Sequence, residues 1–102
     1  MDEQIESWQS KIRNIAPLMQ KAEYELLKAE ADVKRVIALW KAVALSDGIK
    51  TASGQDNFAE NKEEVYQSRL AVAVAKGQLS AVKVELKAIE VGFEEWRTQM
   101  VS

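Results

Sequence analysis

The chain has 102 residues, of which 47% are hydrophobic and 29% are charged, and its formal net charge is −2. It contains no cysteine and no histidine, which excludes disulfide bonds, thiolate metal sites and the commonest general base. The weak acidic balance argues against a general binder of polyanions. One proline and four glycines leave little room for sheets and tight turns. The composition therefore favours one all-α domain over residues 1–102.

The first predicted element is a helix over residues 2–46, with apolar residues three and four positions apart throughout. Such a repeat is typical of a helix in a left-handed coiled-coil seam. Pro17 predicts a kink, with a short separate leading helix as the alternative, because proline lacks a backbone donor and clashes with the preceding turn. The apolar positions are Ile5, Trp8, Ile12, Ile15, Met19, Ala22, Leu26, Ala29, Val33, Val36, Trp40 and Val43.

Residues 48–56 are the predicted connection, because Gly48 suits the left-handed residue that often follows a helix. Asn57 and Glu60 have the spacing of a capping box and predict a second helix over 57–101. This helix repeats the apolar pattern of the first, with Asn61 and Ser68 as its only polar steps. Its apolar positions are Phe58, Val65, Val72, Ala75, Leu79, Val82, Leu86, Ile89, Phe93, Trp96 and Met100.

A short connection between two long helices predicts an antiparallel arrangement. The fold class is accordingly an all-α, coiled-coil-like helical hairpin. Matching large residues with small ones favours a register in which facing residue numbers add up to 108, with Ile15 on Phe93 and Trp40 over Ser68. The alternative is a register of 101, with Trp8 on Phe93. All three tryptophans fall on core positions.

The second helix carries another apolar ladder on its opposite side, where a surface helix is normally polar. We name these residues the back stripe: Leu70, Val74, Gly77, Ala81, Val84, Ala88 and Val91. Scattered surface residues are one interpretation. The preferred one is self-association, in which two hairpins form a homodimeric four-helix bundle. A different protein docking on the back stripe is the third.

Basic residues gather on the outer side of the first helix, and we name them the basic ridge: Arg13, Lys21, Lys28, Lys34, Arg35 and Lys41. The preferred interpretation is a solvated helix flank. A ridge of this kind also suits phosphate contacts, each of which adds salt-sensitive affinity. Glutamates beside it and the lack of an exposed aromatic series count against nucleic-acid binding. An acidic protein partner is the remaining alternative.

Nothing in the sequence points to catalysis. Serines have no histidine or cysteine companions for a triad, and the carboxylates fall outside the predicted seam. We therefore expect no enzyme activity, no cofactor and no metal. The N-terminal residues lack the apolar core of a signal peptide, and no stretch reaches the length of a membrane span. These features predict a cytoplasmic protein without a membrane partner.

In length, acidic balance and predicted hairpin, the chain resembles the secreted WXG100 proteins. It departs from their Trp-x-Gly turn, since its connection reads Ser46-Asp47-Gly48-Ile49 and Trp40 lies inside a helix. The make-up is also similar to small helical proteins of bacteriophages. The leading hypothesis is a non-catalytic interaction or assembly protein, acting as an accessory, inhibitor or chaperone. A nucleic-acid accessory protein and a WXG100-like secreted hairpin are the alternatives.

Overall fold

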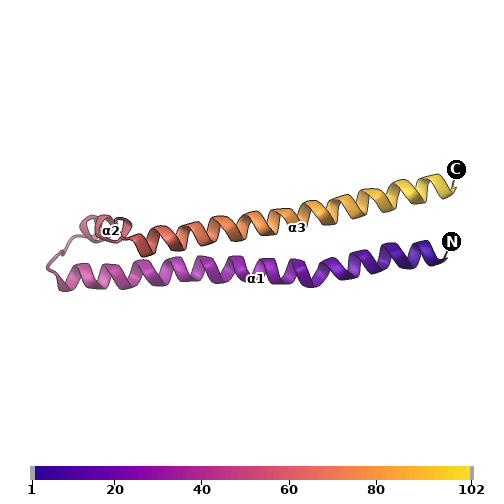
Figure 1. Cartoon of the computed structure of the whole chain (residues 1–102). Coiled ribbons are helices and arrows are strands. Elements are labelled where there is room, and N and C mark those ends of the chain that lie inside the picture. Colours follow the sequence, from indigo (N-terminus) through magenta and orange to yellow (C-terminus); the bar gives the residue numbers. More distant parts are fainter. Residues whose placement is uncertain (1, 102) are drawn as a thin grey trace. The chain divides into compact units, whose positions relative to one another are not determined.

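The computed structural model describes residues 2–101, and within this range every regular element is a helix. The helices are α1 (Asp2–Ser46), α2 (Ala52–Glu60) and α3 (Glu63–Val101), in the order shown in Figure 1. The predicted all-α class is confirmed. Ile5, the first apolar position of the predicted ladder, lies outside the described side chains.

Helix α1 continues through Pro17 without interruption, so the alternative of a separate leading helix is wrong. Pro17 is exposed, which places its ring on the outer side of the helix. Ile15 and Ala22 are buried on either side of it. Burial of the same helix face before and after the proline stabilises the helix against the loss of one backbone hydrogen bond.

Helix α1 ends at Ser46, and Gly48 follows it in the predicted left-handed conformation. The N–H of Ile49 donates to the carbonyl of Ala44 at 2.9 Å, and the N–H of Gly48 donates to the carbonyl of Leu45 at 3.1 Å. These two bonds form a Schellman motif, which satisfies carbonyls that the helix end leaves without partners. Gly48 has a φ of 92°, a conformation that costs other residues about 1–2 kcal/mol.

The predicted connection over 48–56 is wrong, because α2 occupies much of it. Thr51 caps this helix: its side-chain oxygen accepts a hydrogen bond from the N–H of Gly54 at 3.1 Å. Gly54 has no side chain to obstruct that contact, since a Cβ there would lie 2.7 Å from the Thr51 Oγ1 and 2.8 Å from the Ile49 Cγ2. Asn57, the predicted cap, lies inside α2. The side-chain oxygen of Thr51 caps α2 in place of that of Asn57.

The predicted helix over 57–101 is divided at Asn61 and Lys62. The N–H of Asn61 still donates to the carbonyl of Asn57 at 3.3 Å, while the Lys62 carbonyl accepts from the N–H of Val65 at 3.1 Å and so begins α3. Ala59 and Val65 are almost fully buried on the two sides of this break. The break therefore occurs at Asn61, a polar step of the ladder, and allows both flanking apolar residues to be buried.

The chain forms two compact units, residues 1–24 with 77–102 and residues 25–76. In the first unit the Trp8 and Phe93 rings meet edge to face, with centroids 6.2 Å apart. A Cβ at Gly92 would lie 2.8 Å from the Trp8 ring, so glycine makes room for the indole. The register of 108, which placed Ile15 on Phe93, is wrong in this unit. The contact is that of the 101 register, because Gly92 accommodates Trp8.

The second unit is organised around Trp40. Its ring centroid lies 6.3 Å from that of Phe58 in α2. The Lys62 Nζ lies over both rings, 4.6 Å from the Trp40 centroid and 4.3 Å from the Phe58 centroid. Such cation–π contacts are worth about 0.5–1 kcal/mol at partly exposed sites. The predicted stacking of Trp40 over Ser68 is therefore replaced by packing against α2 and the start of α3.

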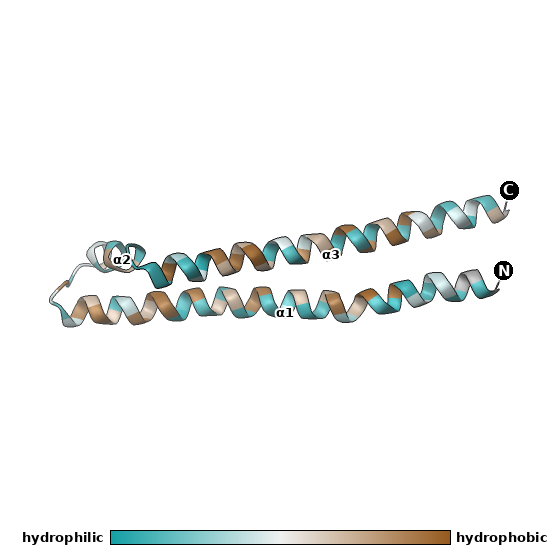
Figure 2. Cartoon of the chain, in the orientation of Figure 1, coloured by the Kyte–Doolittle hydropathy of each residue, from teal (hydrophilic) through white to brown (hydrophobic). Residues whose placement is uncertain are grey.

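Within each unit α1 and α3 run side by side in opposite directions (Figure 1). The buried residues of the described chain are few, and most of them are alanines: Ile15, Ala22, Ala29, Ala44, Ala59, Val65 and Ala75. Val65 is the largest residue among them whose side chain is below 2% exposed. Figure 2 shows apolar residues distributed along both long helices. Most of these residues are only half-buried, so the core of each unit is thin.

The two capping assignments make opposite predictions. Replacing Thr51 with alanine removes the oxygen that accepts from Gly54, and we expect a loss of about 1 kcal/mol in the free energy of unfolding measured with urea. Asn57→Ala is the matched control, and it should change stability by a few tenths of a kcal/mol at most. A larger loss at Asn57 than at Thr51 would restore the cap predicted from the sequence.

Candidate functional site

The structure leaves every residue of the back stripe exposed. The larger side chains are Leu70, Val74, Val84 and Val91, which are 41%, 59%, 70% and 42% exposed. Gly77, Ala81 and Ala88 are exposed as well. All seven residues belong to the single helix α3. No packing within either unit covers this face, so the fold itself gives these apolar residues no role.

Gly77 distinguishes the back stripe from a scatter of surface alanines and valines. Glycine inside a helix costs about 1 kcal/mol relative to alanine. At Gly92 the Trp8 ring explains that cost, whereas a Cβ at Gly77 would meet nothing within 4 Å. Helix packing within the chain therefore does not require a glycine at this position. A second backbone that approaches α3 closely would require one.

Several large apolar side chains of α1 are also exposed. Leu18 and Leu39, which flank the seam, are about half exposed. Tyr24 and Leu27 are 62% and 66% exposed. These four residues form no continuous ladder comparable with the back stripe. Their exposure is ordinary for a protein surface.

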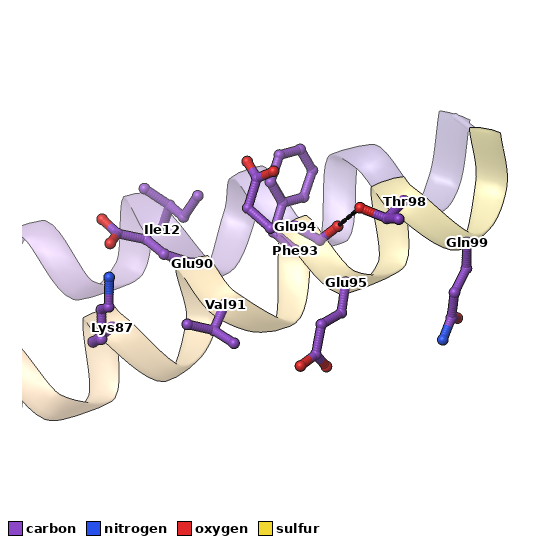
Figure 3. A pocket seen from close by; sticks show the side chains of 9 residues that line it. All are labelled: Ile12, Lys87, Glu90, Val91, Phe93, Glu94, Glu95, Thr98 and Gln99. Atoms are coloured by element: carbon purple, nitrogen blue, oxygen red, sulfur yellow. Dashed lines mark hydrogen bonds between the residues drawn. The ribbon is translucent and has the colours of Figure 1, made fainter. Parts of the chain in front are cut away.

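A groove of about 700 Å³ in the first unit is lined mainly by α3, with Ile12 as its one residue from α1 (Figure 3). Its lining combines apolar and acidic side chains: Ile12, Lys87, Glu90, Val91, Phe93, Glu94, Glu95, Thr98 and Gln99. The Arg97 guanidinium donates to the Glu94 carboxylate at 2.7 Å. The sequence does not predict this groove, because only the fold brings Ile12 of α1 to the lining residues of α3. Val91 belongs both to the groove and to the back stripe.

The basic ridge is partly neutralised in the structure. The Arg35 Nε lies 3.9 Å from an Asp32 carboxylate oxygen, and the Lys41 Nζ lies 2.6 Å from one of Asp56. Arg13, Lys21 and Lys28 are exposed on α1. These ion pairs are surface contacts that contribute little to stability. They do, however, reduce the positive charge that Arg35 and Lys41 present to a ligand.

Lys34 has a setting that the sequence analysis did not foresee. It lines a groove of about 430 Å³ in the second unit together with Arg69 and Lys76 of α3. Glu30 lies in the same lining, and the Arg69 guanidinium donates to the Glu60 carboxylate. The fold thus places Arg69 and Lys76 beside Lys34, a residue of the basic ridge. The three cations come together only because α1 packs against α3 in the second unit. The spacing of residues along the sequence does not predict this cluster.

Among the described residues, no three histidine, cysteine or acidic side chains are close enough to hold a metal ion. The helices of residues 2–101 include none with the length and apolar character of a membrane span. Comparison of the chain with protein-family models, curated proteins and solved structures found no match. The back stripe and the two grooves are thus the three candidate sites for a function.

Proposed function

We propose that the protein is a non-catalytic interaction or assembly protein that buries the back stripe of α3 against another protein chain. In this proposal α1 and α3 form one antiparallel hairpin, and two hairpins associate into a four-helix bundle. The observation that carries it is the exposed apolar ladder with Gly77 at its centre. Seven residues in phase on one helix face are a feature of helices that are buried on that face.

The thin core supports the same conclusion. The chain exposes 7470 Å² of surface, whereas a compact monomer of its 11.5 kDa mass exposes about 5,800 Å². Ordering a chain of this length costs conformational entropy that only apolar burial can offset. Association would supply the missing burial at about 25 cal/mol for each Å² of apolar surface. A partner chain therefore stabilises the fold as well as giving it a function.

The proposed role is that of a small accessory, inhibitor or chaperone-like protein, of a kind found among bacteriophage proteins, that acts in the cytoplasm. We propose no catalytic role, because the sequence lacks histidine, the commonest general base, and cysteine. A partner-binding helix face needs shape and apolar area rather than reactive groups. The back stripe provides both.

Substitution of Val84 by glutamate tests this proposal. Val84 is the most exposed large residue of the back stripe, so a carboxylate there is solvated in the free chain and desolvated in an interface. We expect Val84→Glu to reduce association by at least about tenfold, measured by sedimentation over a concentration series, while circular dichroism stays helical.

The matched control is Lys83→Glu, which introduces the same carboxylate one residue away and off the back stripe. It should leave association within about twofold of the original protein. If Val84→Glu and the original protein associate equally, the back stripe is not the interface and the proposal fails.

A nucleic-acid accessory protein is the second candidate, and the groove that joins Lys34 to Arg69 and Lys76 favours it. This hypothesis predicts binding to a short duplex that weakens by at least about tenfold between 50 and 200 mM salt. Combined reversal of Lys28, Lys34 and Lys76 to glutamate should abolish that binding, measured by fluorescence anisotropy. Absence of binding at low salt, or binding that salt does not affect, would eliminate this candidate.

A further inference from the structure

We infer that the partner of the back stripe is a second copy of this chain, paired antiparallel through α3 with the two-fold axis beside Ala81. This inference rests on the proposed function and specifies its partner and geometry. A two-fold interface uses the same surface patch on both copies, so the patch must be complementary to itself. The back stripe satisfies that condition in one orientation better than in the other.

The first argument is overlap. The back stripe begins at Leu70 and ends at Val91, and Ala81 lies at its middle. Two such helices that run in opposite directions cover all of each other's apolar residues only when their middles coincide. A shift by one heptad in either direction would leave Leu70 or Val91 uncovered at both ends of the interface. Full burial therefore places the two-fold axis beside Ala81.

The second argument is side-chain volume. In the antiparallel arrangement Val84 of the second copy lies near Gly77, and Ala88 of the second copy lies near Val74. Val74 and Val84 then each meet a small residue, as interdigitating layers require, while Val91 lies near Leu70 at the two ends of the interface. A parallel, in-register arrangement would place Gly77 on its own counterpart and Val74 on its own counterpart. The parallel arrangement would leave a gap at the Gly77 layer and crowd the Val74 layer, and both defects reduce stability.

Close approach of the two α3 backbones explains why position 77 is a glycine. Small residues at a helix interface allow the two backbones to come nearer than the usual 8–10 Å between axes. Gly77 and Ala81 are one turn apart on the same face of α3, and neither is covered within the chain. The cost of a glycine inside the helix is offset when a valine of the second copy occupies the space it leaves.

Polar side chains beside the back stripe are compatible with this pairing. Gln78 and Glu85 border it on one side, and the antiparallel arrangement brings the Gln78 amide of one copy near the Glu85 carboxylate of the other. An amide donates a hydrogen bond to a carboxylate. On the other side Lys87 comes near Ala73, so no two like charges meet directly across the central part of the interface.

The surface that the chain leaves exposed is large enough to accommodate a dimer interface of standard size. A stable dimer buries about 800 Å² of each partner. The back stripe extends over about six helical turns, and the chain exposes 7470 Å² against the roughly 5,800 Å² of a compact monomer. One interface of standard size would therefore remove about half of the excess surface. A second copy is a partner that is always present at matching concentration.

Cross-linking through single cysteines tests the geometry cleanly, because the chain has no cysteine of its own. In the proposed dimer Ala81 lies next to its counterpart, whereas the two copies of Ala88 are about 20 Å apart along the helix axis. We expect Ala81→Cys to form a covalent dimer under mild oxidation, at least about tenfold faster than Ala88→Cys. Both positions are exposed alanines on one helix face, so each serves as a control for the other's folding and thiol reactivity.

The outcomes separate this inference from the proposed function. Equal cross-linking at both positions indicates a parallel pairing; it overturns the antiparallel geometry and leaves the interaction function standing. A non-covalent dimer that cross-links at neither position associates through another face. That result overturns both the antiparallel pairing and the proposed use of the back stripe. A chain that stays monomeric at every concentration overturns the second copy as partner and, with it, the four-helix bundle of the proposed function.

Discussion

Helix α3 is apolar on two opposite faces, and a single neighbouring helix can cover only one of them. Its front face packs on α1 in both units, where Trp8 meets Phe93 and where Val65 is buried. Its back face, from Leu70 to Val91, has no cover within the chain. The proposals depend on this constraint. The chain folds with one apolar face of α3 uncovered, and that face is available to a partner chain.

The thin core and the uncovered face of α3 are related, because an interface on that face would supply apolar burial that the core lacks. Five of the seven buried residues are alanines, which bring helices close but bury little area each. Larger side chains such as Trp40 and Phe58 are only half-buried and gain support from the Lys62 ammonium group over their rings. An interface on α3 would add apolar burial along the same helix. Folding and association would then stabilise each other, as in other small helical proteins that assemble into bundles.

The sequence predicted the helices from their spacing but not their ends or their register. Gly48 ends α1 as expected, because a left-handed residue there is a local property of glycine. Thr51 was overlooked as a cap in favour of Asn57, and the break at Asn61 depends on burial of residues on both sides. The register of 108 is wrong because matching volumes at the core positions leaves out Gly92, whose lack of a side chain accommodates Trp8. Facing residues, and hence both grooves, follow from that register. The back stripe was found from spacing alone, because it lies on one helix.

The mass of the unmodified protein in solution tests the central claim most directly. Light scattering after size exclusion, at several loading concentrations and at low and high salt, should give twice the chain mass of 11.5 kDa in every condition. Apolar burial does not weaken with added salt, so the dimer should persist at high salt. A mass of one chain at all concentrations would contradict the account, because the back stripe would then remain exposed without a second copy to cover it.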